Sequence, residues 1–85
     1  MYYVYILRLS DGRYYIGQTN NLTKRYRRHE SGQVKSTKPF RPVELIYHED
    51  FRTRSEAMKR ESTLKKWKSH RAIDKLFNAS GGLIV

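Results

Sequence analysis

The sequence of 85 residues contains no cysteine. This absence excludes disulfide bonds, thiolate zinc sites and cysteine nucleophiles together. Long hydrophobic runs are also missing, because no segment approaches the roughly 20 apolar residues of a membrane span and Arg8 interrupts the first apolar stretch. We therefore expect a cytoplasmic protein that neither spans a membrane nor carries a secretion signal.

Acidic residues are scarce compared with basic ones. Eight Asp and Glu stand against eighteen Lys and Arg, which gives a formal net charge of +10. Such an excess favours nucleic acid as the partner, although a merely soluble basic surface would have the same composition. A membrane surface is a weaker candidate, because no segment places Trp, Phe and Leu opposite a basic face.

Glycine and proline are few, and their positions help to divide the chain. Residues 1–9 and 13–18 are rich in aromatic and β-branched side chains, and Ser10-Asp11-Gly12 between them has the chemistry of a turn. This arrangement predicts a β-hairpin. Both alternating faces of the first strand are largely apolar, so we expect helices to pack against at least one side of the sheet. A third strand is predicted over residues 43–47.

The segment after the hairpin predicts a helix over residues 22–30. Asn20 or Asn21 can cap its start, and Gly32 is placed to end it. A polar, basic loop should follow over residues 33–41, where Pro39 and the adjacent Pro42 discourage regular structure.

Two further helices are predicted towards the end of the chain. Thr53 and Glu56 have the spacing of a capping box, and the helix that they open should continue to Trp67. A last helix is predicted over about residues 70–79, with Ser69 as its cap and Gly81-Gly82 as its stop. The expected fold class is α+β, a small three-stranded antiparallel sheet flanked by about three helices, in a single domain over residues 1–85.

Glu61 is an anomaly in the second of these helices. At about 100° per residue it falls on the same stripe as Ala57 and Leu64, so a carboxylate stands where an apolar side chain would pack. It could face a pocket. It could also be one half of an ordinary surface pair with Lys65, since pairs of that spacing are common and weak.

Side chains suited to cleaving a phosphodiester occur in order along the chain. Tyr15-Ile16-Gly17 follows Tyr3-Val4-Tyr5 by the length of a hairpin, and Arg25 and His29 lie one helical turn apart before Glu61. Phenol oxygens can transfer protons, a guanidinium can hold a phosphate, an imidazole can add a hydrogen bond or a proton, and a carboxylate can hold a divalent metal. Each residue alone has an ordinary interpretation, as a strand aromatic or a solvated charge, so the ordered set is the signal.

With these residues in view, the chain resembles a GIY-YIG endonuclease domain over about residues 2–68. Tyr3-Val4-Tyr5 and Tyr15-Ile16-Gly17 stand for the two signature triplets, and Lys24 to His29 for the basic helix that follows them. Arg60-Glu61 stands for the metal-binding glutamate of a later helix. The chain is most similar to the small stand-alone bacterial members, whose relatives include the nuclease subunit of bacterial excision repair.

The resemblance implies a metal-dependent endonuclease that hydrolyses one DNA strand at a single divalent-metal site, with Mg²⁺ as the expected ion. Tyr5 would be the general base with Tyr15 beside it, Arg25 would clamp the phosphate, His29 would assist by hydrogen bond or proton transfer, and Glu61 would hold the metal. An unperturbed phenol has a pKa near ~10, so Tyr5 can act as a base at neutral pH only if nearby cations favour its phenolate. The basic composition leads us to expect that they do.

The candidate DNA contacts belong to the basic helix and the loop that follows it. They are Lys24, Arg27, Arg28, Lys35, Thr37, Lys38 and Arg41. Because the chain is short, we expect its specificity to come from DNA shape, from a protein partner or from self-association, in repair, recombination or processing of DNA.

Two positions depart from the family pattern, since Tyr3 replaces a glycine and Gln18 stands where some relatives have a lysine. Two other hypotheses also stay open. A catalytically weak or inactive nucleic-acid-binding module on the same scaffold would keep the charge while Glu61 only pairs with Lys65. A protein-interaction adaptor would instead expose an apolar patch.

Overall fold

The computed structural model describes residues 1–67 and 70–79. Its sheet has three antiparallel strands in the order β2-β1-β3, so β1 (Tyr2–Arg8) is central, with β2 (Tyr14–Thr19) on one side and β3 (Glu44–Phe51) on the other. The hairpin register pairs Tyr5 with Gly17 and Leu7 with Tyr15. The predicted hairpin and third strand are confirmed.

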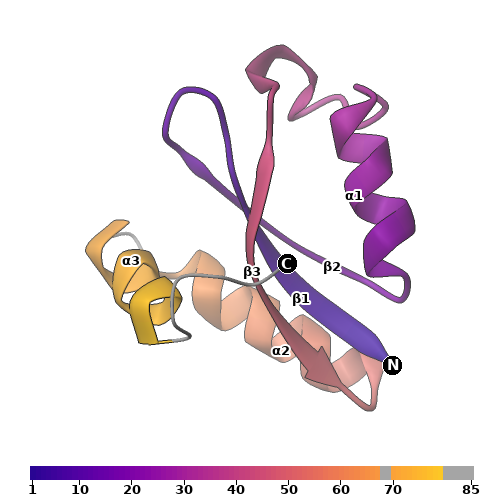
Figure 1. The fold of residues 1–85 in the computed structure, drawn as a ribbon. Coiled ribbons are helices and arrows are strands. Elements are labelled where there is room, and N and C mark those ends of the chain that lie inside the picture. Colours follow the sequence, from indigo (N-terminus) through magenta and orange to yellow (C-terminus); the bar gives the residue numbers. More distant parts are fainter. Residues whose placement is uncertain (68–69, 80–85) are drawn as a thin grey trace.

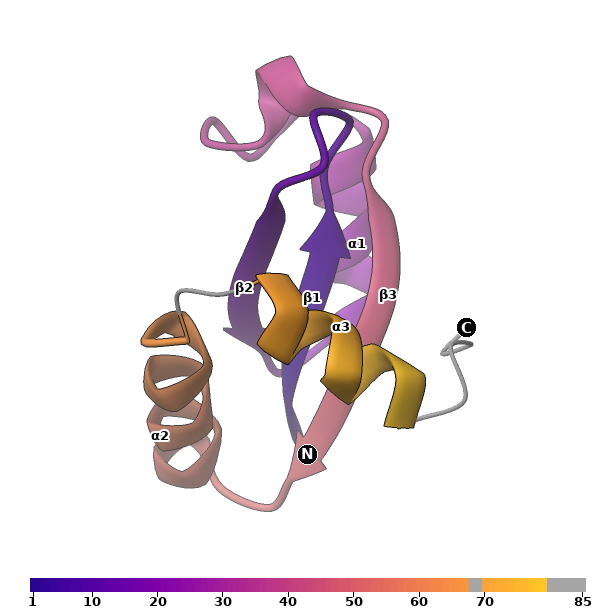
Figure 2. The same ribbon diagram turned by 90° about the vertical axis from the view of Figure 1, so that its left-hand side faces the viewer.

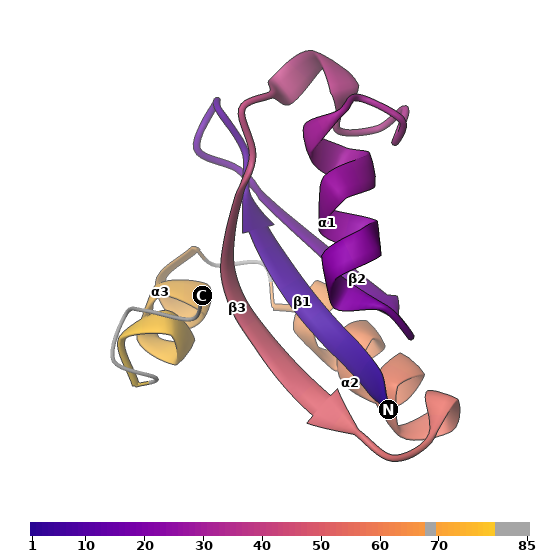
Figure 3. The same cartoon turned by 45° about the vertical axis from the view of Figure 1, so that its right-hand side comes forward.

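Three α-helices surround the sheet (Figure 1). The views in Figures 2 and 3 show α1 (Leu22–Glu30) over one face, and α2 (Arg54–Lys65) and α3 (His70–Ala79) on the other side. The predicted α+β class is therefore confirmed, with helices on both faces. No helix in the described part of the chain is long and apolar enough to cross a membrane.

The helix ends follow the chemistry of their capping residues. The Asn21 side chain accepts a hydrogen bond from the Lys24 backbone N–H at 3.0 Å, and Gly32, at φ 80°, follows the last turn of α1. At the start of α2, Thr53 and Glu56 bond each other reciprocally in a complete capping box. Both helix starts were therefore readable from the sequence.

Three predicted boundaries need correction. Strand β3 continues past Tyr47 to Phe51, because its polar second half pairs with the start of β1, beyond a bulge opposite Ile6 and Leu7. Helix α2 ends at Lys65 and does not reach Trp67. The basic loop contains one turn of 3₁₀-helix, η1 (Lys38–Phe40), since proline is tolerated in a first helical turn. The predictions of a Ser69 cap and of a stop at Gly81-Gly82 lie outside the described residues.

Each face of the sheet buries its own apolar cluster. Beneath α2 and α3 the buried residues are Val4, Ile6, Ile46, Ala57, Leu64 and Ile73. Beneath α1 they are Tyr5, Leu7, Leu9, Val43 and Leu45, with Leu22 and Tyr26 of α1 packed against them. Burial of this kind contributes roughly 25 cal/mol per Å² of apolar surface. The second cluster matters for function because it contains a hydroxyl group, that of Tyr5.

Candidate active site

The Tyr5 ring lies across Gly17, its partner on the neighbouring strand. A Cβ atom at Gly17 would stand 2.5 Å from the Tyr5 hydroxyl oxygen and 2.6 Å from Cζ. Carbon contacts are normally 3.5 to 4.0 Å, so only glycine leaves room for the phenol here. Tyr5 is 1% exposed, so its hydroxyl must find its partners inside the protein.

Helix α1 supplies both partners of that hydroxyl. His29 Nε2 lies 3.0 Å from the Tyr5 oxygen, and Arg25 Nε donates to the same oxygen at 3.3 Å. Arg25 and His29 are one turn apart on α1 and so reach the same atom. The structure therefore brings together three of the predicted site residues on one oxygen.

Tyr15 completes the group through its ring. Its centroid is 5.0 Å from that of His29 at an interplanar angle of 64°, and 6.3 Å from that of Tyr5. Edge-to-face contacts of this kind orient aromatic rings. Tyr15 is only half-buried, so it lies between the buried hydroxyl of Tyr5 and the surface.

The other ring nitrogen of His29 points to the loop after α1. His29 Nδ1 lies 2.8 Å from Thr37 Oγ1, and Thr37 Oγ1 is 3.3 Å from the carbonyl oxygen of Val34. Both His29 and Thr37 are completely buried. The prediction that Thr37 contacts DNA is therefore wrong for this structure, because its side chain has no exposed surface and bonds within the protein.

Burial controls the protonation of the two central groups. It lowers the pKa of His29 to about 4, with the nearby charges of Arg25 and Arg28 acting in the same direction, so the imidazole is neutral at pH 7. Burial also raises the pKa of Tyr5 above its ordinary value, despite the hydrogen bond and charge of Arg25. The expectation that cations favour a phenolate is therefore wrong for the free protein.

Glu61 approaches the site from the other side of the sheet. Ala57 and Leu64 of α2 are completely buried, as the predicted stripe requires, and Glu61 lies partly buried between them. Its carboxylate is close enough to be a minor contributor to the raised pKa of Tyr5, after burial and the charge of Tyr15. It also pairs with Lys65 Nζ at 3.3 Å, the surface pair that their spacing on the helix allows.

Metal binding by Glu61 can be tested against the donors around it. Among residues 1–67 and 70–79 no three His, Asp or Glu side chains form a cluster able to hold a metal ion. A lone, partly exposed carboxylate still suits Mg²⁺, which proteins often bind through one or two carboxylates while water and substrate phosphate complete the coordination. Glu61 thus fits a site that the substrate completes.

Arg60, the neighbour of Glu61, fixes α2 to the sheet. Its Nε and Nη2 atoms donate to the two carboxylate oxygens of Glu49 on β3, at 2.8 and 3.0 Å. Tyr47 donates to the same carboxylate at 2.5 Å, and burial and that carboxylate raise the pKa of Tyr47 to about 12. Since a bidentate pair fixes orientation as well as distance, it sets the direction in which α2 presents Glu61.

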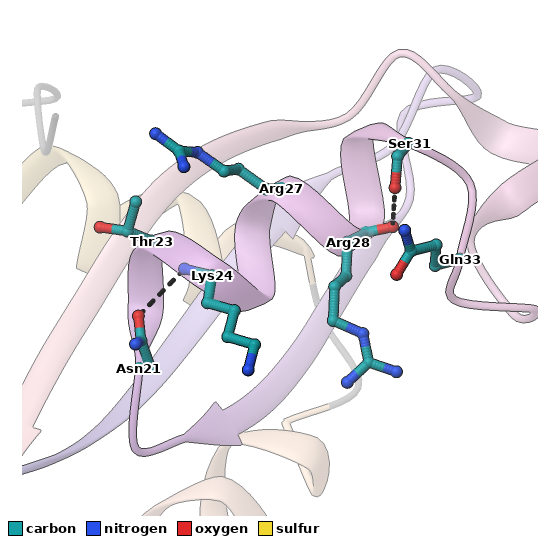
Figure 4. A pocket seen from close by; sticks show the side chains of 7 residues that line it. All are labelled: Asn21, Thr23, Lys24, Arg27, Arg28, Ser31 and Gln33. Atoms are coloured by element: carbon teal, nitrogen blue, oxygen red, sulfur yellow. Dashed lines mark hydrogen bonds between the residues drawn. The ribbon is translucent and has the colours of Figure 1, made fainter.

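A cationic hollow of about 610 Å³ lies along the outer side of α1 (Figure 4). Lys24 and Arg28 extend from the same side of the helix, and Arg27 extends from the opposite side. Hydroxyl and amide groups complete the lining, which contains no carboxylate. The lining residues are Asn21, Thr23, Lys24, Arg27, Arg28, Ser31 and Gln33.

A second hollow, of about 250 Å³, connects this surface with the catalytic candidates. It is lined by Arg25 together with Lys24 and Arg28, and by polar residues at the start of α1. The same arginine that bonds Tyr5 thus also borders the cationic surface.

The loop candidates divide into exposed and structural residues. Lys35 and Lys38 are exposed on either side of the buried Thr37. Arg41 is also exposed, but its guanidinium donates to the backbone carbonyls of Lys38 and Glu30 at 3.1 and 3.4 Å. Arg41 therefore ties the loop to the end of α1, which leaves the two lysines as its free cations.

Sequence reasoning missed the roles of Gly17 and Thr37. The glycine had a readable signal, since it faces Tyr5 in the hairpin register and only a missing side chain could make space for a ring there. Thr37 had none, because a threonine between two lysines has the pattern of surface loop. Its contact with His29 depends on how the loop folds back on α1.

The fold is a small α+β domain in which Tyr15, Arg25 and His29 surround the Tyr5 hydroxyl. The model of the GIY-YIG catalytic domain matches residues 1–74. The chain therefore belongs to the GIY-YIG family, a family of nucleases that act on DNA and generally use divalent metals.

Similar proteins carry the name UPF0213. One from Bacillus pumilus is 49% identical over 67 residues, which are 78% of this chain and 68% of that protein. One from Staphylococcus saprophyticus is 46% identical over 65 residues, which are 75% of this chain and 79% of that protein. The solution NMR structure of a UPF0213 protein from Bacillus halodurans superimposes with a TM-score of 0.62 at 36% identity, covering 96% of this chain and 88% of the other. These names specify no reaction.

Proposed function

We propose that this protein is a metal-dependent endonuclease that hydrolyses a phosphodiester bond of DNA, in repair, recombination or processing. One observation carries the proposal: a neutral imidazole and a guanidinium both bond the Tyr5 hydroxyl oxygen. Hydrolysis of a phosphodiester needs a group that takes a proton from water and a cation that holds the phosphate. Here both functions meet at one atom.

Tyr5 would act through His29, because its raised pKa disfavours a preformed phenolate. As water attacks phosphorus, the water proton passes to the Tyr5 oxygen while the Tyr5 proton passes to His29 Nε2, 3.0 Å away. The oxygen–phosphorus bond forms, the bond from phosphorus to the leaving deoxyribose oxygen breaks, and that oxygen takes a proton from solvent. His29, whose pKa is about 4, then returns the proton that it received to solvent.

Arg25 would change partner when DNA binds. Its bond to Tyr5 is long at 3.3 Å, and it borders the hollow that Lys24 and Arg28 also line. A phosphate entering that hollow attracts the guanidinium more strongly than a neutral phenol does. This exchange stabilises charge on the phosphate and frees a lone pair of Tyr5 for the incoming proton.

Glu61 would hold the divalent ion, for which Mg²⁺ is the expected choice. When bound, such an ion stabilises negative charge on the phosphate as a Lewis acid. Lys65 must then release the carboxylate. Little energy opposes this, because an ion pair with its lysine 57% exposed contributes at most about 1 kcal/mol.

DNA binding is supported by the exposed cations of α1 and of the loop that follows it. Lys24, Arg27 and Arg28 on α1 and Lys35 and Lys38 in the loop are all exposed, and no hydrogen bond or ion pair occupies their side chains in the described part of the chain. Like charges this close repel one another unless an anion lies between them. A phosphate backbone provides anions at regular spacing.

Glu61→Gln tests the proposal, with Glu44→Gln as the matched control. Both remove one negative charge at nearly constant shape, but Glu44 is an exposed residue at the start of β3. We expect Glu61→Gln to fold and to bind DNA while losing Mg²⁺-dependent cleavage, and Glu44→Gln to keep it. The assay presents branched, flapped, nicked and plain duplex DNA with Mg²⁺ and looks for discrete products.

The ion pair of Glu61 with Lys65 favours a second candidate, a nucleic-acid-binding module without turnover. In that case the wild-type protein binds DNA, cuts none of the substrates, and Glu61→Gln changes stability by less than about 1 kcal/mol. Nicking by Glu61→Gln at the wild-type rate would contradict the assignment of Glu61 as the metal ligand.

A further inference from the structure

The hydrogen bonds of the buried imidazole can be assigned one by one. A threonine hydroxyl carries one proton and a neutral imidazole carries one, on either nitrogen. If Thr37 donates to the Val34 carbonyl, 3.3 Å away, its oxygen must accept from His29 Nδ1–H. His29 Nε2 is then bare and accepts the proton of Tyr5.

The opposite tautomer leaves a proton without a partner. With Nε2 protonated, both His29 and Arg25 would donate to the Tyr5 oxygen, and the Tyr5 proton would have no acceptor among the described residues. A buried donor left unpaired costs roughly 1 to 3 kcal/mol. The first assignment gives each of these protons an acceptor.

We propose that Thr37 is a positioning residue, which holds His29 in the Nδ1–H tautomer so that Nε2 can receive the Tyr5 proton during cleavage. This inference rests on the proposed function for its catalytic part. Its structural part concerns only where one proton resides.

The loop conformation explains why Thr37 can perform this task. The backbone N–H groups of Thr37 and Lys38 donate to the Val34 carbonyl at 3.1 and 2.9 Å, which forms a tight turn. That turn holds the Thr37 hydroxyl over His29, where it is completely buried. Water therefore does not compete for this ring nitrogen, and the hydroxyl is the partner of His29 Nδ1 among the described residues.

Three variants test the role of Thr37. Thr37→Val keeps the shape and removes the hydroxyl, Thr37→Ser keeps the hydroxyl, and Thr63→Val makes the same exchange on the exposed side of α2. Nitrogen-15 NMR of the histidine rings in the free protein reports the tautomer, with His29→Gln used to assign the signals of His29. Cleavage assays at saturating DNA report kcat apart from KM.

We expect the wild-type, Thr37→Ser and Thr63→Val proteins to show His29 protonated at Nδ1. Thr37→Val should show Nε2–H or a mixture, with kcat lowered roughly ten-fold or more and DNA affinity unchanged, since proton transfer by a positioned group is worth ~10² or more in rate. Thr37→Ser should restore most of the rate.

Two results would overturn the inference: an Nε2–H tautomer in the wild type, or a Thr37→Val protein whose tautomer and kcat match the wild type. Failure of the proposed function looks different. If the wild-type protein cuts no DNA, the catalytic role of Thr37 falls with the proposed function, whereas the ring-nitrogen spectra still decide whether Thr37 sets the tautomer.

Discussion

Substitution of Gly17 by alanine tests the position of the Tyr5 phenol alone, because it moves the ring and removes no functional group from the site. The new methyl carbon would lie 2.5 Å from the hydroxyl oxygen and 2.6 Å from Cζ, whereas ordinary contacts need at least 3.4 Å. The methyl carbon is attached to the rigid backbone of β2 and cannot yield, so the Tyr5 ring must move by about 1 Å. Its bonds to His29 and Arg25 are then stretched or broken.

The expected cost has two parts. Overpacking of a buried ring costs about 1 to 3 kcal/mol, and at 2 kcal/mol a domain of this size loses roughly 8 to 16 °C in Tm. Displacing a reacting group by about 1 Å costs on the order of 10²-fold in rate. We therefore expect Gly17→Ala to be folded at 20 °C, to bind DNA like the wild type, and to cleave it about 100-fold more slowly.

Gly12→Ala is the control for lost stability. Gly12 has φ 89° in the hairpin turn, and a Cβ atom there meets nothing within 4 Å. Alanine at such a φ costs roughly 1 to 2 kcal/mol without touching Tyr5. This variant should melt earlier and cleave normally. A Gly17→Ala protein with wild-type Tm and wild-type cleavage rate would refute the packing argument.

Two further predictions concern charge. The pKa of His29 is about 4 in the folded protein and about 6.5 in an unfolded chain, so the unfolded state binds the extra proton first as pH falls. The free energy of unfolding should therefore drop by about 3 kcal/mol between pH 6.5 and pH 4. Urea titrations of the wild type and His29→Gln check this, and an equal acid dependence in both proteins would contradict it. Exposed Lys35 and Lys38 should each contact a phosphate. Lys35→Gln and Lys38→Gln should therefore each make the plot of log binding constant against log salt concentration less steep by about 1, equally for all DNA sequences. The same exchange at exposed Lys59 on α2 is the control, and loss confined to one DNA sequence would instead indicate base readout.

The elements that sequence predicted best are those set by local chemistry. Helix α1 has the predicted bounds, because the Asn21 cap and the glycine after its last turn act within a few residues of the helix ends. The capping box of α2 is equally local. Strand β3 was predicted too short, because His48-Glu49-Asp50 has the composition of a loop and becomes strand only through pairing with β1.

For the candidate site, the sequence indicated which residues meet but not their protonation. Tyr5, Arg25 and His29 converge as the hairpin and the helix spacing suggested. The pKa of Tyr5 was misjudged, because counting cations along the chain ignores how deeply the phenol is buried. Thr37 was misplaced for a similar reason, since exposure is decided by contacts between distant segments.

The network of Tyr5, His29 and Thr37 also has a consequence for the protein's stability. Polar groups that satisfy one another in a core contribute less than apolar side chains of the same volume would. On the α1 side of the sheet, the apolar cluster of Leu7 and Leu45 also contains the Tyr5 hydroxyl, which contacts the His29 imidazole. Selection for folding alone favours hydrocarbon at such positions. The polar network thus costs this small domain some stability, a cost that fits the proposed role of Tyr5 in proton transfer.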